Sequence, residues 1–505
     1  MYGLDPPHFY TAPGLSFNAC LKYTDVKLEL FTARDPSMLP FVEKGVRGGI
    51  STIVTRYAKA NNPYVPGYDP SQPCKYIMYL DANNLYGWAM SQPLPIGGFR
   101  FMTCEEIIAF DVLKTNMSSD KGYIFEVDLE YPDDLHDLHN DYPLAVERIA
   151  VTEDMLSPLC KDLSVKINKT CTPSNAEKLI PNFYPKRDYV VNGQLLQFYL
   201  KQGLILKKIN RILEFDQCPW LEKYITLNTE KRKLAKSTFE KDFFKLCNNS
   251  VYGKVLQNDR KRSDIRLVVD QKKAELLLAR PEFESYEIIN EYLSMIKLRQ
   301  TSVYWNKPTS VGFCVLELSK LLMYQFHYDY IVKKYGKNAT LLFTDTDSLC
   351  YEITTPDIYK DMQADKDLFD TSDYPKDHPL YSPVNSKVIG KMKDECNGKP
   401  PLEFVGLRSK MYSLLLQDDK HKCTAKGVQR AFLKKRVTHQ DYLDCLQQQT
   451  RTQASFHNIV SKNHNVTTAK ITKIGLSAYD DKRFLLRDSP RTLAYGHKDC
   501  ALYNS

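Results

Sequence analysis

Three short motifs, far apart in the sequence, carry the residues from which one chemical site could be built. They are YLDANNLYG at 79–87, KLCNNSVYG at 245–253 and FTDTDS at 343–348. The first and third place aspartates at the ends of apolar, β-prone runs, and the second places a lysine on a predicted helix. Carboxylates suit hard divalent cations, and a lysine suits a phosphate. The set therefore predicts a fold that gathers these segments around two metal ions and a polyphosphate.

Each motif also has an ordinary structural interpretation. FTDTDS reads as a hairpin turn, because Asp and Thr favour turns. YLDANNLYG reads as a strand followed by a turn, and KLCNNSVYG as an amphipathic surface helix with a solvated lysine. Their occurrence together, in this order, is what favours the chemical interpretation.

Local patterns predict the elements that carry the motifs. KYIMYL at 75–80 is a strand ending at Asp81, and TLLFT at 340–344 is a strand that turns at DTD and returns as SLCYEI. GYIFEVDLEY at 122–131 alternates as a half-buried strand does. The run at 316–336 is predicted to be one long amphipathic helix ending near a glycine.

Two helices are predicted before and through the second motif. The first runs from Pro219 to about Lys236, and the second begins at Ser237, because STFE has the form of a capping box. On the second helix Lys245, Asn249 and Tyr252 recur on one face. A second face, formed by Phe239, Phe243 and Leu246, is predicted to pack the helix against the body.

Composition sets broad limits on the class of protein. The chain has 505 residues, a net charge of +8 and 13 cysteines without zinc-site spacing, so we expect several subdomains and free thiols in a reducing compartment. The basic balance is compatible with a nucleic-acid partner. No apolar run reaches membrane-spanning length, and the first residues do not have the pattern of a signal peptide. We therefore expect an intracellular protein that is not secreted and has no membrane partner, in either the nucleus or the cytoplasm.

The three motifs resemble motifs A, B and C of the protein-primed branch of family B DNA polymerases, and SKMY at 409–412 resembles that family's KxY motif. YGLDPPHFYTAPGL near the start, and LSAYDDKRF and LAYGHKD near the end, are most similar to the Maverick/Polinton group. The resemblance extends over essentially the whole chain.

That resemblance implies a reaction and its participants. The chain would be a DNA-directed DNA polymerase, a nucleotidyltransferase that adds dNTPs to a primer 3′-hydroxyl on a DNA template. Its cofactors would be two Mg²⁺ ions, with Mn²⁺ as the alternative. The natural primer would be a hydroxyl group on a terminal protein, and we expect the chain itself to be a monomer.

The resemblance also implies a role for particular residues. The catalytic and metal-binding residues would be the aspartates Asp81, Asp345 and Asp347. Tyr86 would be the steric gate that excludes ribonucleotides. The nucleotide would be bound by Asn84, Leu85, Tyr86, Lys233, Lys245, Asn249 and Tyr252. The primer and template would be contacted by Ser250, Gly253, Lys410 and Tyr412.

The implied fold is α+β: a right-hand polymerase fold with palm, fingers and thumb, plus two insertion subdomains. We expect an N-terminal lead-in at 1–75, palm with motif A at 76–115, an insertion and palm at 116–215, and fingers with motif B at 216–256. A second insertion would follow at 257–310, palm with motif C at 311–400, and the KxY motif and thumb at 401–505.

Departures from the family pattern are few. Asn84 and Gly87 replace a serine and a proline that many members carry in motif A, and Phe343 replaces the tyrosine before the motif C acids. Relatives carry a 3′–5′ exonuclease domain before a segment like the one at the start of this chain, so we expect a polymerase domain without proofreading. The alternative is a catalytically inactive, nucleic-acid-binding relic of a viral or transposon polymerase. The tyrosine at the gate position disfavours an RNA-making enzyme.

Overall fold

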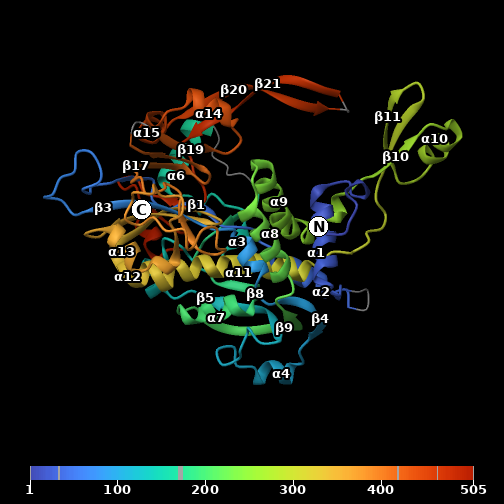
Figure 1. The fold of residues 1–505 in the computed structure, drawn as a ribbon, viewed down its shortest axis with the longest axis horizontal. Helices are drawn as coiled ribbons and strands as arrows, with labels where there is room; N and C mark the ends of the chain where they lie inside the picture. Colours follow the sequence, from blue (N-terminus) through green and yellow to red (C-terminus); the bar gives the residue numbers. More distant parts are fainter. Residues whose placement is uncertain (1, 32–34, 169–174, 418–419, 463–464, 504–505) are drawn as a thin grey trace.

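The computed structural model describes residues 2–31, 35–168, 175–417, 420–462 and 465–503. Helices alternate with sheets that are almost entirely antiparallel, so the chain is an α+β protein, as predicted. Two projections leave the central body (Figure 1). One is a long hairpin of β20 (Arg451–Lys462) and β21 (Asn465–Ser477). The other is a small module of β10 (Asp264–Val268), α10 (Gln271–Leu278), β11 (Phe283–Asn290) and β12 (Leu293–Leu298).

A six-stranded sheet holds the first and third motifs. Its order is β1-β13-β14-β3-β16-β15, and only the β15–β16 pair is parallel among the described residues. Strand β3 therefore lies directly beside the hairpin β13–β14, as the two β-prone runs predicted. The strands are β1 (Ser51–Ile53), β3 (Lys75–Ala82), β13 (Ala339–Asp345), β14 (Ser348–Thr354), β15 (Phe369–Asp370) and β16 (Met392–Asp394).

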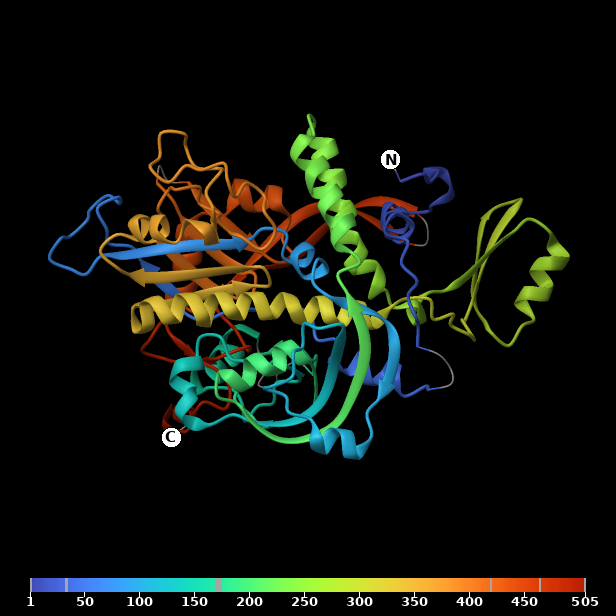
Figure 2. The same cartoon turned by 60° about the horizontal axis from the view of Figure 1, so that its bottom comes forward.

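Helix α11 (Thr309–Gln325) runs through the middle of the body, between this sheet and a second one (Figure 2). The second sheet has the order β4-β9-β5-β8. The helix predicted at 316–336 is confirmed and ends at Gly336, but the amphipathic pattern is wrong over α11, where nearly every residue is buried because the helix is covered on both sides. A π-helical segment, Phe326–Val332, and α12 (Lys333–Tyr335) continue it. The strands of the second sheet are β4 (Leu94–Phe101), β5 (Lys121–Glu130), β8 (Lys186–Asn192) and β9 (Ile205–Cys218).

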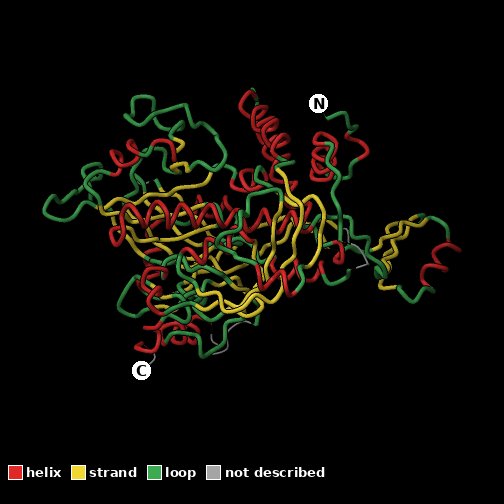
Figure 3. Tube along the Cα trace, turned by 90° about the horizontal axis from the view of Figure 1, so that it is seen from below, coloured by secondary structure: helices red, strands yellow, loops and turns green. Residues whose placement is uncertain are grey.

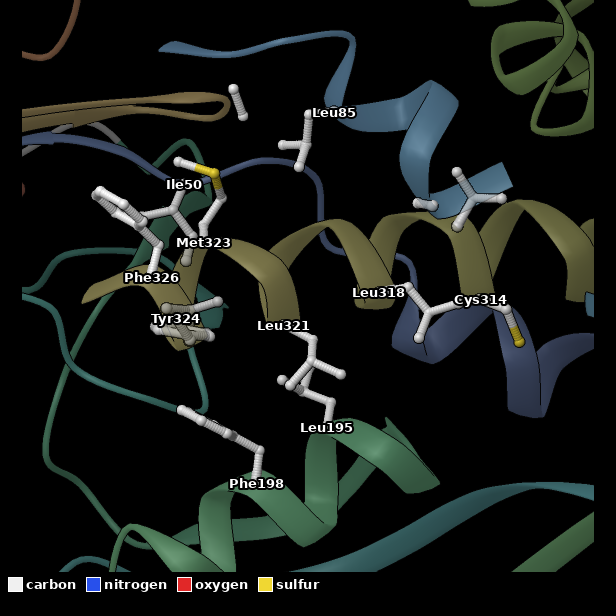
Figure 4. Close-up of a cluster of buried hydrophobic side chains, with 14 of the residues drawn as sticks. Ile50, Leu85, Leu195, Phe198, Cys314, Leu318, Leu321, Met323, Tyr324 and Phe326 are labelled. Atoms are coloured by element: carbon white, nitrogen blue, oxygen red, sulfur yellow. The ribbon is translucent and has the colours of Figure 1, made fainter. Parts of the chain in front are cut away.

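The core around α11 ties the first motif to the rest of the molecule. Leu85, in the short helix α3 (Leu85–Met90), packs on the side of α11 that faces the first sheet (Figure 4). Leu195 and Phe198 of α7 (Gly193–Lys201) pack on the opposite side. The segment after the first motif is thus held by a large buried cluster, which restricts where its neighbours Asn84 and Tyr86 can point.

Helices α8 (Glu222–Leu234) and α9 (Thr238–Val255) form an antiparallel pair that stands out from the body (Figure 2). The capping box is confirmed: the Ser237 side chain accepts from the Glu240 backbone N–H, and the Glu240 side chain accepts from that of Ser237. The predicted packing face was wrong. Phe239 is 78% exposed and Leu246 is 43% exposed. Only the second half of α9 reaches the body, so it buries Val251 and its neighbours instead.

The remaining elements complete the body, which Figure 3 shows from below. A third sheet has the order β19-β18-β17-β2 and packs against the first through a shared apolar cluster. Its strands are β2 (Tyr57–Lys59), β17 (Glu403–Arg408), β18 (Met411–Leu415) and β19 (His421–Ala425). Two small pairs are β6 (Glu147–Ile149) with β7 (Lys178–Ile180), and β22 (Phe484–Leu485) with β23 (Thr492–Leu493). The other helices are α1 (Ala12–Thr24), α2 (Met38–Gly45), α4 (Cys104–Ala109), α5 (His136–His139), α6 (Pro158–Leu163), α13 (Ile358–Ala364), α14 (Arg430–Arg436) and α15 (His439–Gln447). None of the helices in the described ranges combines the length and the apolar character that crossing a bilayer requires.

Two buried histidines make the fold sensitive to acid. Burial lowers the pKa of both His139 and His327 to about 3, and their rings lie in a cluster of tyrosines. A histidine with a depressed pKa stays neutral in the folded state but takes up a proton on unfolding below its ordinary pKa. The stability that it contributes is therefore complete above about pH 6.5 and is lost as the pH falls toward 3.

We expect His327→Phe to reduce this acid sensitivity. A phenyl ring keeps the aromatic contacts, and between pH 6.5 and pH 5 the variant should lose about 2 kcal/mol less unfolding free energy than the parent. Urea unfolding at the two pH values measures the difference. His457→Phe is the matched control, because His457 is exposed on β20. An equal pH dependence for the parent and His327→Phe would contradict the assignment.

Candidate active site

The first and third motifs meet where β3 and β14 pair. Asp81 of β3 lies opposite Ser348 of β14, and the Ala82 backbone N–H donates to the Asp347 carbonyl over 2.7 Å. The carboxylates of Asp81 and Asp347 therefore come from adjacent strands at one end of the sheet. The strand–turn–strand expected from FTDTDS is confirmed.

The segment that leads into β1 packs against the tight turn between β13 and β14. Thr346 has a left-handed backbone (φ 66°), and its N–H donates to the Ile50 carbonyl over 2.7 Å. A Cβ at Gly49 would lie 2.6 Å from the Thr346 side chain. The glycine thus lets the segment before β1 approach the turn and hold Asp345 and Asp347 in place.

Both Asp81 and Asp347 have a raised pKa. Burial, then the charges of Asp347 and Glu395, raise the pKa of Asp81 to about 8. Burial, followed by the charge of Asp345, also raises the pKa of Asp347, and Lys245 acts in the opposite direction on both. Among the described residues, no lysine or arginine forms an ion pair with Asp81 or Asp347. Two half-buried carboxylates without an ion-pair partner form a donor set that fits a hard divalent cation.

Asp345 differs from the other two. Its Oδ1 forms an ion pair with Lys410 Nζ at 2.7 Å, and this buried oxygen accepts no hydrogen bond. Within the described ranges, the acidic and histidine side chains whose ligand atoms all lie within 4.8 Å are Asp137, His497 and Asp499, far from the motifs in the sequence. The motif aspartates thus lie near one another, but among the described residues their ligand oxygens do not all come within 4.8 Å. Asp345 is already paired with the ammonium group of Lys410.

The residues after Asp81 form a wall of the site. Tyr86 stacks on Tyr252 of α9, with ring centroids 4.2 Å apart and planes inclined by 12°. Asn84 has a left-handed backbone (φ 45°), and a Cβ on Gly87 would lie 2.0 Å from its side-chain nitrogen. Asn84 and Gly87 therefore depend on each other, since the Asn84 amide occupies the space that a larger residue at 87 would need.

The predicted face of α9 is divided between two surroundings. Lys245 lies close enough to Asp81 and Asp347 to lower the pKa of both, and Tyr252 contacts Tyr86. Asn249 instead lines a groove of about 900 Å³ between α9 and the start of α1, together with Ser250 and Gly253.

Lys233 lies near the end of α8. In the part of the chain that the structure describes, its side chain is exposed and forms no hydrogen bond or ion pair. The structure therefore does not bring Lys233 into contact with the other predicted residues.

The KxY residues reach the site from the third sheet. Lys410, at a left-handed position (φ 59°), contacts Asp345, as described above. Tyr412 is only 6% exposed: its ring stacks on Phe343 at 4.0 Å, and its hydroxyl is 3.0 Å from that of Tyr79. The ring of Tyr412 therefore supports the strands that carry the aspartates.

Sequence reasoning missed Glu395, which follows β16 and raises the pKa of Asp81. No motif surrounds it, and only the pairing of β16 with β3 places it at the site.

No protein-family model and no curated protein matches the sequence. Among solved structures, Phi29 DNA polymerase with primer-template DNA and incoming nucleotides superimposes with a TM-score of 0.53 at 14% identity, over 92% of this chain and 67% of that one. Its complex with primer-template DNA gives a TM-score of 0.52 at 15% identity, over 94% and 68%. The chain therefore has a DNA polymerase fold, and specifically the fold of the Phi29 enzyme.

Because a half-buried carboxylate with a raised pKa destabilises the folded state once it is charged, Asp81→Asn should stabilise the metal-free protein. The stability lost through Asp81 grows as the pH rises from about 4 to about 8, so the variant's advantage should grow over the same range. At pH 8 in EDTA we expect an unfolding midpoint about 2–4 °C higher than that of the parent. Differential scanning calorimetry measures it. Mg²⁺ should reduce this difference in unfolding midpoint, because it should stabilise only the parent. In EDTA, a midpoint of Asp81→Asn below that of the parent would contradict the electrostatic account.

Proposed function

We propose that the chain is a template-directed DNA polymerase of the protein-primed family B type, which adds dNTPs to a primer 3′-hydroxyl. One observation carries the proposal: Asp81 and Asp347 come from neighbouring antiparallel strands, with Lys245 beside both, within a DNA polymerase fold. Charge of both signs at one end of a sheet is what positioning a metal-bound triphosphate requires.

Two Mg²⁺ ions, or Mn²⁺, would be held by Asp81 and Asp347, with Asp345 as the third carboxylate. When bound, such ions lower the pKa of an attacking hydroxyl and neutralise a leaving pyrophosphate. Lys410 would keep Asp345 ionised and positioned until substrates arrive. The three motif carboxylates and both lysines are present, and nothing in the described residues favours the inactive relic.

The chain's own side chains would then position the nucleotide. Lys245 and Lys233 would bind the triphosphate, and Asn84 and Leu85 would set the turn that faces it. The stacked rings of Tyr86 and Tyr252 would lie against the sugar. Ser250, Asn249 and Gly253 would contact the template side, where they line the groove beside α9. Lys410 and Tyr412 would serve the primer terminus.

The hairpin β20–β21 supports a DNA partner. From Arg451 to Tyr479 the sequence has no acidic residue, and the exposed cations Arg451, Lys462, Lys470 and Lys473 lie on its strands. A cationic ribbon of this kind fits the phosphates of a primer-template duplex. On this proposal residues 401–505 form the KxY region and thumb, 216–256 the fingers and 257–310 an insertion. The terminal protein as primer rests on the family resemblance.

Primer extension tests the function. The purified chain, a labelled primer-template, dNTPs and Mg²⁺ should give products that lengthen with time and stop on addition of EDTA. A DNA-binding but inactive parent, assayed with both Mg²⁺ and Mn²⁺, would overturn the proposal.

A further inference from the structure

A buried carboxylate outside the three motifs is hydrogen-bonded to the first of them. Asp370, at the end of β15, is only 2% exposed. It accepts hydrogen bonds from the Asn83 side-chain amide at 2.7 Å, the Lys387 backbone N–H at 2.8 Å and the Ser372 backbone N–H at 3.0 Å. Burial acts to raise the pKa of this carboxyl, but its hydrogen bonds hold the pKa below the usual value. Asp370 is therefore an ionised buried group that needs these donors.

Asn83 is bonded to the same part of the chain through its backbone as well. Its N–H donates to the Lys391 carbonyl at 2.9 Å, and its carbonyl accepts from the Gly390 N–H at 2.8 Å. Both partners lie in the connection between β15 and β16, which the bond from the Lys387 N–H ties to Asp370. Asn83 is thus held through its side chain and through both of its backbone groups.

The backbone that follows Asn83 needs such support. Asn84 has a left-handed backbone (φ 45°), which costs energy in most residues other than glycine, and it leads into helix α3, whose second residue is Tyr86. Gly390 also packs on this helix, because a Cβ there would lie 2.6 Å from the Trp88 ring. A change in the orientation of the Asn83 peptide would therefore turn Tyr86 relative to the aspartates.

Asp81 does not depend on the same support. It lies within the strand ladder, opposite Ser348 of β14 on one side and Lys393 of β16 on the other. Strand β3 ends at Ala82, so Asn83 is the first residue beyond it. The hydrogen bond from Asn83 to Asp370 therefore acts on the turn after the strand, and the ladder alone holds the metal-binding carboxylate.

We propose that Asp370 is a positioning residue of the candidate active site: through Asn83 it fixes the turn at Asn84 and hence the gate residue Tyr86. This inference rests on the proposed function and adds a residue that determines selection of the sugar. Asp370 contacts no substrate and acts only through Asn83. An ionised acceptor suits this role, because a charge-assisted hydrogen bond is roughly twice as strong as a neutral one.

Hydrogen–deuterium exchange tests the positioning without any activity. In Asp370→Ala and in Asn83→Ala, the amides of residues 83–90 should exchange about tenfold faster than in the parent, because each variant removes the same hydrogen bond. Asn83 is only half-buried, so Asn83→Ala provides the test even where Asp370→Ala does not fold. Asp367→Ala is the matched control, since Asp367 is an exposed aspartate three residues before Asp370, and it should exchange as the parent does.

Kinetics test the consequence for selection of the sugar. In Asp370→Ala, the ratio of kcat/KM for a dNTP to that for the matched rNTP should fall about tenfold, and the KM for dNTP should rise more than kcat falls. A general loss of folded enzyme lowers both kcat/KM values equally and leaves their ratio unchanged. The double variant Asp370→Ala/Asn83→Ala should resemble each single variant, because all three lack the same hydrogen bond.

The outcomes separate this proposal from the proposed function. Parent-like exchange of residues 83–90 in a folded Asp370→Ala or Asn83→Ala variant overturns the proposal, whatever the activity of the parent. An unchanged dNTP-to-rNTP ratio in an active Asp370→Ala variant, or fully additive effects in the double variant, also refutes it. If exchange rises in both single variants but the parent extends no primer, the proposed function fails and the support of the turn by Asp370 stands.

Discussion

Replacing Asp347 with asparagine is expected to lower primer extension by about 1,000-fold or more, while primer-template affinity stays within about threefold of the parent. Asparagine keeps the shape of the side chain and removes its charge. Asp347 lies in the turn just before β14, near Asp81, and no lysine or arginine pairs with it in the described residues, so its charge is free to hold a divalent ion. Duplex binding instead draws on surfaces such as the β20–β21 hairpin, which the substitution does not touch.

Single-turnover extension and an independent DNA-binding measurement separate the two effects. Asp367→Asn is the matched control, because Asp367 is exposed outside the site and should behave as the parent does. Asp345→Asn should lose less activity than Asp347→Asn, since Lys410 already neutralises Asp345. Extension by Asp347→Asn within threefold of the parent would refute the assignment of the site.

Much of the fold could be predicted because its signals are local. The capping box at Ser237 and Glu240 depends on residues three apart, and the turn at 345–347 lies between two short β-prone runs. Helix α11 shows the limit of such reasoning. Its burial on all sides depends on two sheets built from distant segments, so a pattern that looks amphipathic in isolation does not report its surroundings.

The residues of the site also fall into those that a local motif marks and those that only the fold brings in. Asp81, Asp347 and Lys245 could be chosen from motif chemistry, and the structure brings them near one another. Glu395 could not, because no local pattern marks it and only the pairing of β16 with β3 brings it to the first motif.

Tyr86→Val is expected to raise incorporation of ribonucleotides relative to deoxynucleotides by about 100-fold. Two contacts restrict the position of Tyr86. Its neighbour Leu85 is buried against α11 (Figure 4), and Tyr252 stacks on the Tyr86 ring. A ring held so firmly cannot move aside for a 2′-hydroxyl, whereas valine leaves space for it.

The ratio of kcat/KM for a matched rNTP and dNTP pair measures this selectivity. Tyr86→Phe is the critical comparison: it keeps the ring and removes only the hydroxyl, so a steric gate should remain closed. Tyr252→Ala removes the stacking partner and should relax selectivity partly, because the Tyr86 ring then gains freedom to turn. If Tyr86→Val discriminates as the parent does, the ring does not contact the sugar. If Tyr86→Phe loses selectivity as fully as Tyr86→Val, the phenol hydroxyl and not the bulk of the ring excludes ribonucleotides.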